Sequence, residues 1–224
     1  MDPGRIAKSF DLAKFPANRT LVTGLMRSWV EIVRTWGAAV LCPYTASTGL
    51  GVGMSKAPVR IGLISDTHGL LREEALTALR GSELIVHAGD VGDPDILPQL
   101  RKLGPVVAVR GNVDTEAWAR RELPETAVAQ AGDISIYVLH DVHALDLDPV
   151  AAGFSLVVSG HSHKFAQTEK GGVTYVNPGS AGPRRFTLPI TVARLNLAER
   201  PWKAEFVDLE KFVDLEKKVS GWTG

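Results

Sequence analysis

The chain has 224 residues, 45% of them hydrophobic, which is enough for one sizeable core with an appendage rather than two full domains. Its 25 basic and 25 acidic side chains give a formal net charge of +0, so we expect neither long nucleic acids nor membranes as partners. Arg27, Glu31 and Arg34 interrupt the most apolar stretch, residues 21–41, and we expect no membrane span or secretion signal. Because Cys42 is the single cysteine, no internal disulfide can form, and we expect a cytoplasmic location.

The first 57 residues differ in composition from the rest and are predicted to be an N-terminal extension, either disordered or an artefact of a wrongly assigned start. The linker-like stretch TASTGLGVG ends just before Met54, and the sequence that follows, MSKAPVRIGLIS, is typical of the beginning of an α/β domain. Met54 is therefore a candidate first residue. The alternative is an amphipathic partner helix with Leu21, Leu25, Trp29 and Val33 on one face, although such a stripe more often packs on its own core.

Three short apolar runs predict buried strands: residues 59–65 (VRIGLIS), 83–89 (ELIVHAG) and 105–111 (PVVAVRG). The first two runs are followed by the helical patterns REEALTALR and PDILPQLRKL, and Glu73 and Glu74 suit the first turn of a helix. Alternation of strand and helix predicts a largely parallel, layered α/β sheet.

After residue 111 no clear helix returns, and one strand pattern follows another. The segments are ETAVAQAGD, ISIYVLHD, FSLVVSGHSH, KFAQTEKGG, VTYVNPGS and TLPITVARLNL, and they predict a second, more antiparallel sheet. The main domain is expected over residues 58–210. Residues 211–224 are expected to be a C-terminal tail that carries a second copy of FVDLEK, and two copies do not make a repeat architecture.

Residues that can bind metal follow the ends of five of these strands. In α/β sheets ligands lie beyond the carboxyl ends of the strands, so these side chains should converge in one crevice. Carboxylate, amide and imidazole groups gathered in this way suit a pair of divalent cations. The predicted ligands are Asp66, His68, Asp90, Asn112, His140, His161 and His163.

The motifs differ in strength when each is taken alone. DTH at Asp66 is more often a turn or a helix cap, and GD at Asp90 is common turn chemistry. GHSH, which contains His161 and His163, is the sharpest, because two imidazoles directly after a buried strand have little reason to pack in a core. Asp90 is the predicted bridging ligand, since a carboxylate has one oxygen for each cation.

The ordered set DTH, GD, GNVD, a lone His140 and GHSH, with YVNPGSAGPRR after it, resembles the calcineurin-like metallophosphoesterases, and among them the small YfcE-type phosphodiesterases. The resemblance covers residues 58–210. It implies an α/β fold, a two-sheet α/β sandwich with flanking helices. It also implies one cation on Asp66, His68, Asp90 and His163, and a second on Asp90, Asn112, His140 and His161.

From this resemblance we predict a metal-dependent phosphodiesterase that hydrolyses small or nucleotide-like phosphate esters, with Asn112 contacting both metal and phosphate. Two cations would polarise the phosphoryl oxygens and activate a water as hydroxide. The resemblance favours Mn or Ni, and the donor set also accepts Zn or Fe. Two alternatives stay open, a phosphomonoesterase and a non-catalytic scaffold of the Vps29 type, as does a homo-oligomeric state.

Two positions depart from the family pattern. Val113 stands where larger members carry a histidine as general acid, which favours substrates with good leaving groups, and Asp114 is predicted to orient a water instead. Asp141 follows His140 where a glycine is common, and it either supports a ligand from the second shell or faces solvent. His87 is expected to be a core or supporting histidine.

The remaining polar residues receive weaker predictions. His143 is expected to be solvated. Arg184 and Arg185 could bind a substrate phosphate through their guanidinium groups, but surface charges are the more ordinary interpretation.

Overall fold

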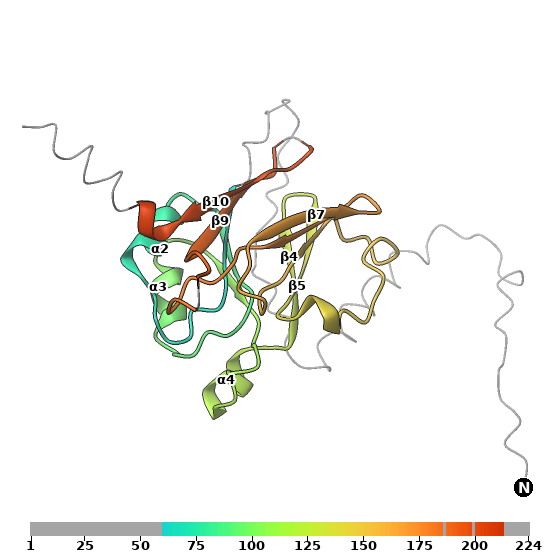
Figure 1. Cartoon of the computed structure of the whole chain (residues 1–224). Helices are drawn as coiled ribbons and strands as arrows, with labels where there is room; N and C mark the ends of the chain where they lie inside the picture. The colour runs from blue at the N-terminus through green and yellow to red at the C-terminus, as the bar shows by residue number, and fades with distance from the viewer. Residues whose placement is uncertain (1–59, 186, 199, 213–224) are drawn as a thin grey trace, which may run out of the picture. The chain divides into compact units, whose positions relative to one another are not determined.

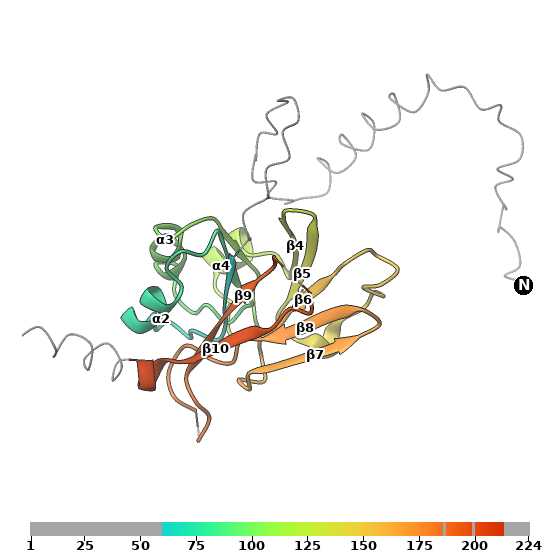
Figure 2. The ribbon, with the colours of Figure 1, turned by 90° about the horizontal axis from the view of Figure 1, so that it is seen from above.

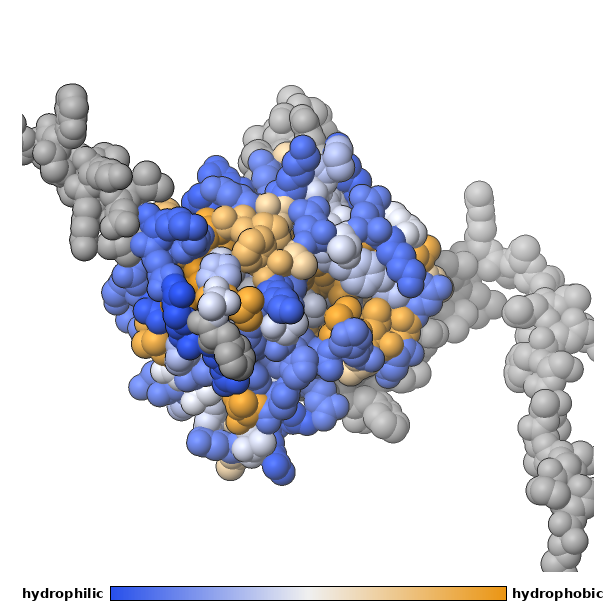
Figure 3. Space-filling view, viewed as in Figure 1, coloured by the Kyte–Doolittle hydropathy of each residue, from blue (hydrophilic) through white to orange (hydrophobic). Residues whose placement is uncertain are grey.

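The computed structural model describes residues 60–185, 187–198 and 200–212 (Figure 1). The predictions made for the N-terminal extension, including Met54, and for most of the C-terminal tail lie outside these residues. Within them, no helix combines the length and the apolar character that crossing a membrane requires. Hydrophilic residues predominate on the face drawn in Figure 3, with apolar residues in smaller patches between them.

The first sheet has five strands, and its centre is parallel as predicted. Across the sheet they are β10 (Ala204–Asp208), β9 (Thr191–Asn196), β1 (Arg60–Ile64), β2 (Leu84–His87) and β3 (Val106–Ala108). Strands β1, β2 and β3 pair in parallel, whereas β9 runs antiparallel to β1, with Leu63 opposite Ala193. Our assignment of residues 187–197 to the second sheet was therefore wrong. β1 is buried along almost its whole length, so it needs a hydrogen-bonded neighbour on each edge, and β9 supplies the second one.

The second sheet also has five strands and is mixed rather than mainly antiparallel. Its order is β4 (Thr126–Ala131), β5 (Ile134–Leu139), β6 (Leu156–Val158), β8 (Val173–Asn177) and β7 (Ala166–Lys170). The pairs β4–β5 and β7–β8 are antiparallel hairpins, while β6 is parallel to both of its neighbours. Gly171 and Gly172 connect β7 to β8 with φ angles of 62° and 78°, as a tight two-residue hairpin turn requires.

Two apolar clusters hold the layers together. One lies between the sheets and combines Ile61 and Val86 of the first with Ile136 and Val158 of the second. The other packs the opposite face of the first sheet against helices α2 (Glu73–Ala78), α3 (Ile96–Arg101) and α4 (Ala117–Glu122). Figures 1 and 2 show α2 and α3 on the opposite side of the first sheet from the second sheet. The predicted two-sheet α/β sandwich with flanking helices is confirmed.

Helix α4 was not predicted, and the reason is local. It has six residues, AWARRE, and of these Ala119 is the one that is buried. A short helix with one buried position carries no apolar periodicity, so no pattern in the sequence reveals it.

Candidate metal centre

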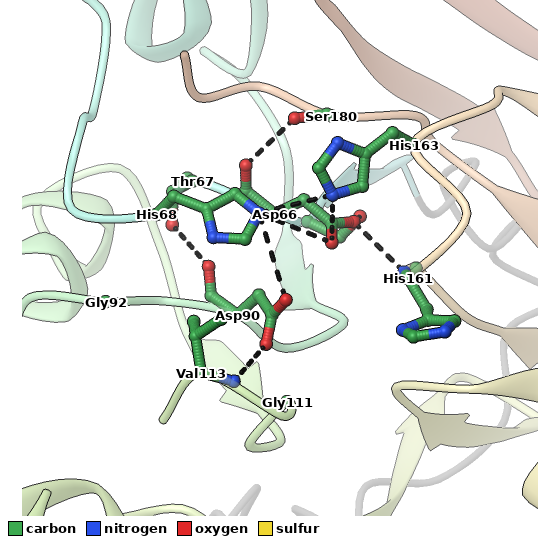
Figure 4. A network of polar contacts seen from close by, with 12 residues as sticks. Asp66, Thr67, His68, Asp90, Gly92, Gly111, Val113, His161, His163 and Ser180 are labelled. Atoms are coloured by element: carbon green, nitrogen blue, oxygen red, sulfur yellow. Dashed lines mark hydrogen bonds and ion pairs between the residues drawn. The ribbon is translucent and has the colours of Figure 1, made fainter. Parts of the chain in front are cut away.

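The first ligand loops begin where two neighbouring parallel strands end. Asp66 and His68 follow β1, and Asp90 follows β2, so the two loops leave the same edge of the sheet. Backbone hydrogen bonds then join the loops in register, from Asp66 N–H to Gly89 O at 2.9 Å and from His68 N–H to Asp90 O at 2.9 Å. The carboxylates and the imidazole are thereby brought to one place (Figure 4).

The backbone at the predicted ligands is unusual. Among the described residues, the non-glycine positions with a left-handed φ are all predicted ligands: Asp66 (54°), His68 (46°), Asp90 (54°), His161 (67°) and His163 (58°). This conformation costs roughly 1–3 kcal/mol per residue and persists when the surroundings enforce it, typically at functional sites. The strained loops therefore mark the same positions as the sequence motifs do.

One group of donor atoms gathers around Asp66. His163 Nε2 lies 3.2 Å from Asp66 Oδ1 and 3.2 Å from His68 Nε2. His68 Nε2 also lies 4.0 Å from Asp66 Oδ1. These three side chains come from loops on both sheets, and Figure 4 shows them directed toward a common point. They have the spacing of a metal site, with their ligand atoms within 4.8 Å of one another.

A second group shares Asp66 with the first and adds Asp90 and His140. His140 Nε2 lies 3.4 Å from Asp90 Oδ2, and Asp90 Oδ2 lies 3.8 Å from His68 Nε2. Asp90 therefore lies near donors of both groups, whereas the residue that the groups share is Asp66, and the bridging role of Asp90 stays a prediction. The other ring nitrogen of His140, Nδ1, is 2.7 Å from the carbonyl of Ala88. Because a carbonyl only accepts, Nδ1 carries the proton of the neutral ring and leaves the Nε2 lone pair directed into the site.

Two atoms of this site are buried without a hydrogen-bond partner in the described part of the chain: Asp66 Oδ1 and His140 Nε2. A buried carboxylate oxygen with no donor is costly, and a cation placed there would remove that cost. Both atoms belong to the donor sets described above. The residues present therefore fit a centre of divalent metal ions bound by mixed nitrogen and oxygen ligands.

The pKa values follow from burial and from contacts within the site. Burial alone would raise the pKa of Asp90, but contacts with His140 and with the Val113 N–H lower it below its ordinary value. Burial tends to lower the pKa of His140, and the contacts with Asp90 and the Ala88 carbonyl outweigh this and raise it. Burial lowers the pKa of His68; Asp90 opposes this and Arg185 adds to it. The lowered pKa values of Asp90 and His68 favour their metal-binding forms, whereas the raised pKa of His140 favours protonation, which competes with metal binding.

The other predicted ligands lie at the rim. The side chain of His161 is 41% exposed, and its ring centroid is 5.2 Å from that of His140. The backbone N–H of His161 donates to Asp66 Oδ2 at 3.2 Å. Asn112 is exposed, beside Val113, whose N–H donates to Asp90 Oδ1 at 3.0 Å. The structure thus brings His161 next to the clusters, and the ligand role of Asn112 stays a prediction.

The contacts of Asp114 favour a supporting role over the predicted positioning of a water. Its buried carboxylate accepts hydrogen bonds from the N–H groups of Val91 (3.1 Å), Gly92 (2.8 Å) and Gly111 (2.8 Å). Oδ2 accepts from both the Asp90 loop, at Val91, and the Asn112 loop, at Gly111, while Oδ1 accepts from Gly92 alone, so the carboxylate joins the two loops. A catalytic role for Asp114 stays a prediction.

Sequence reasoning did not select several loop supports. Ser180 Oγ donates to the carbonyl of Asp66 at 3.0 Å, and Asn177 Nδ2 donates to the carbonyl of Gly160 at 2.6 Å, directly before His161. Both supports belong to the segment VNPGS, so the available signal was the motif itself. Its serine and asparagine bond backbone atoms, which no residue spacing reveals.

Comparison with known proteins agrees with this geometry. Residues 59–200 match the calcineurin-like phosphoesterase superfamily domain. The chain belongs to this superfamily. A probable metallophosphoesterase of Methanothermobacter thermautotrophicus is 33% identical over 149 residues, which are 61% of this chain and 86% of that protein. The YfcE-type resemblance and the predicted fold are thereby supported at family level.

Two solved structures show the same superfamily fold at lower identity. A conserved protein of Streptococcus pneumoniae TIGR4, described as a predicted phosphoesterase, aligns with a TM-score of 0.57 at 24% identity, over 69% of this chain and 91% of that one. Vacuolar Protein Sorting 29 from Cryptosporidium parvum aligns with a TM-score of 0.54 at 19% identity, over 67% of this chain and 98% of that one. At these identities both similarities concern the fold alone.

Proposed function

We propose that this calcineurin-like phosphoesterase is a metal-dependent phosphodiesterase that acts on small or nucleotide-like phosphate esters. One observation carries the proposal: two groups of ligand atoms overlap at Asp66, Asp90 of the second group also lies near His68 of the first, and two of their buried atoms have no hydrogen-bond partner among the described residues. A pair of divalent cations, Mn or Ni by family likeness, would supply an activated water near neutral pH and neutralise charge on the phosphoryl group.

The side chains around the cations have separable tasks. Asp90, whose pKa is lowered, stays ionised and holds the centre together. The fixed Nδ1–H of His140 keeps the ring oriented so that Nε2 faces the site. Asn112 lies at the exposed rim, where its amide could bind a phosphoryl oxygen. Arg184 forms an ion pair with Glu210, which agrees with the expected surface role for this arginine.

The protein charges around the site are mainly negative. Asp66, Asp90 and Asp141 surround the site, whereas Arg185 is the cation whose field reaches His68. A monoester carries about 1.5 to 2 negative charges near pH 7, and a diester carries one. Two divalent cations would carry four positive charges against these three carboxylates and could neutralise either ester, so the diester and the monoester are compared directly in the test below.

The residue at the general-acid position predicts which diesters react. Val113 is 44% exposed at the rim and cannot donate a proton from its side chain. General acid catalysis is typically worth about 10² to 10⁴-fold, so diesters with aryl or other good leaving groups should be preferred. The substitution Val113→His should raise turnover on alkyl esters selectively, and an equal change on aryl and alkyl substrates would count against this explanation.

The test is metal-stimulated hydrolysis of bis-p-nitrophenyl phosphate by the full chain after treatment with chelator and reloading with Mn²⁺. We expect activity in the wild type and background rates in Asp90→Asn and His140→Ala. His143→Ala is the matched control, because His143 is exposed and outside both ligand groups. Faster hydrolysis of p-nitrophenyl phosphate than of the diester would identify a monoesterase. Metal binding without hydrolysis of either substrate would favour the scaffold alternative.

A further inference from the structure

We propose that His87 is a positioning residue of the metal centre, and that it acts through the hydroxyl of Thr67 to hold the two loops carrying Asp66, His68 and Asp90. The inference rests on the proposed function, because it concerns the same metal ligands. His87 lies in a strand, and its described side-chain hydrogen bond goes to Thr67 rather than to a predicted metal ligand.

The starting observation is a buried polar pair below the site. His87 is in β2 and Thr67 lies between Asp66 and His68, and both side chains are fully buried at 0% exposure. His87 Nε2 is 2.9 Å from Thr67 Oγ1. A polar pair at this depth needs its hydrogen bonds to be satisfied, so its geometry restricts which atom donates.

The direction of each hydrogen bond follows from counting protons. Thr67 Oγ1 is 2.9 Å from the carbonyl of Val91, and a carbonyl only accepts, so the single hydroxyl proton goes there. The contact with His87 must then be donated by Nε2–H. Burial lowers the pKa of His87 to about 4, so near neutral pH the ring carries one proton, and Nδ1 is bare. Nδ1 is also buried without a partner in the described part of the chain.

The resulting chain of bonds runs from β2 through His87 and Thr67 to Val91. It connects the loop after β1 with the loop after β2, where the ligands have left-handed backbone angles. The backbone bonds between these loops come from Asp66, His68 and Gly69 N–H, and the hydroxyl of Thr67 adds a fastening between them. A leucine in place of His87 could fill much of the space without leaving a bare nitrogen. What the imidazole provides and a leucine would lack is the hydrogen-bond donor that it gives to Thr67.

The experiment is a double-mutant cycle on metal affinity in the full chain. The affinity for Mn²⁺ is measured by competition with a fluorescent chelator, after circular dichroism has shown that each variant is folded. The variants are His87→Leu and Thr67→Val, which remove the bond, and their combination. The controls are His87→Gln, whose amide keeps a donor near the position of Nε2, and Thr67→Ser, which keeps the hydroxyl.

Loss of support around metal ligands typically weakens metal binding by about 10 to 100-fold, and we expect this from each bond-removing variant. Because both substitutions remove the same hydrogen bond, the double variant should bind Mn²⁺ no more weakly than the single variant with the lower affinity. The two controls should stay within about 3-fold of wild type. Unchanged affinity in His87→Leu, or additive losses in the double variant, would overturn the proposal, because a merely structural histidine lowers stability without this pattern.

A second measurement does not depend on metal. ¹⁵N NMR of the imidazole should report the Nε2–H tautomer of His87 in the metal-free protein, and the Nδ1–H tautomer would overturn the proposed direction of the bonds. Failure of the proposed function is recognised separately, because it would leave the wild type inactive on phosphodiesters while the affinity cycle and the tautomer are unaffected.

Discussion

The two sides of the metal centre differ in burial and in support. Around Asp66, which is 0% exposed, His68 and His163 lie within short distances, and the loops are fixed by backbone and side-chain hydrogen bonds. Around His161, with 41% of its side chain exposed, the contacts are longer and solvent has access. Asn112 belongs to this exposed side as well, whereas Asp90 and His140, the other predicted ligands of the second cation, are buried.

The difference teaches how the two cations should bind. A site whose donors are already held in place loses little freedom when the ion arrives, whereas an exposed site has to order its side chains first. We therefore expect the buried side, with Asp66, to bind its cation more tightly than the exposed side, with His161. The substitutions below test this inequality, beginning with the largest expected effect.

Replacing one ligand on each side gives the sharpest test. Removing one charge from a buried set costs about 3–5 kcal/mol, so Asp66→Asn should weaken the tighter Mn²⁺ by on the order of 10³-fold and, because Asp66 belongs to both donor groups, should weaken the second Mn²⁺ as well. His161→Asn should remove the weaker Mn²⁺ and leave the tighter one in place. Isothermal titration with Mn²⁺ resolves the two equivalents. Loss of both equivalents in His161→Asn would show that the two sides do not bind independently.

The junction between the sides can be broken sterically. A Cβ added at Gly111 would lie 2.1 Å from Asp90 Oδ1 and 2.4 Å from Asp90 N, so Gly111→Ala has to displace the Asp90 carboxylate. Displacements of about 1 Å cost on the order of 10²-fold in rate, and we expect a loss of this size in diester hydrolysis. Gly104→Ala is the control. Its Cβ would meet the backbone oxygen of Ser82 at 3.0 Å, and neither residue is a predicted ligand. Equal losses in both variants would point to folding instead of the junction.

Acid should destabilise the protein through the buried side. The pKa of His87 is about 4 in the folded protein and near 6.5 in the unfolded chain, so the unfolded state binds more protons between these values. Above pH 6.5 His87 causes no loss in the free energy of unfolding. The loss grows as the pH falls toward 4, to on the order of 3 kcal/mol. The raised pKa of His140 acts in the opposite direction, so the comparison has to be with His87→Gln. Urea unfolding in the presence of chelator should show that the free energy of unfolding falls less between pH 7 and pH 4.5 in this variant than in wild type.

The sequence predicted the positions of the ligand loops because a visible cause places them there. Each predicted ligand follows an apolar run, and runs that become neighbouring strands end at the same edge of a sheet. The ordered motifs then identified the family and with it the sandwich. The alternation of strand and helix up to residue 111, and its absence afterwards, also separated β1, β2 and β3 from the early strands of the second sheet.

What the sequence left undetermined depends on contacts between distant residues. Apolar alternation in residues 191–196 shows a strand but not its partner, and β9 pairs with β1 because β1 has a free edge. The three N–H groups on Asp114 and the bond from His87 to Thr67 form only when separate loops meet. Exposure of His161 is likewise a property of the assembled edge.

The smallest expected effect concerns the exposed side. Asp141 Oδ2 lies 3.9 Å from His161 Nε2, while Oδ1 accepts a hydrogen bond from His143 N–H at 2.9 Å. A carboxylate beside Nε2 favours the tautomer with its proton there, and Nδ1 would then be the ring nitrogen free to bind a cation. Exposed pairs of this kind contribute about 0.2–1 kcal/mol, so Asp141→Asn should weaken the second Mn²⁺ by less than about 5-fold and leave the first unchanged.

Asp148→Asn is the control that separates the charge of Asp141 beside His161 from the hydrogen bond by which Asp141 holds its own turn. Asp148 accepts the N–H two residues ahead of it, at 3.0 Å, just as Asp141 does, but lies outside both ligand groups. Asp148→Asn should therefore leave both Mn²⁺ affinities as in wild type. If Asp141→Asn weakened the first cation as much as the second, the carboxylate would be acting on the whole edge, and the proposed independence of the two sides would be wrong.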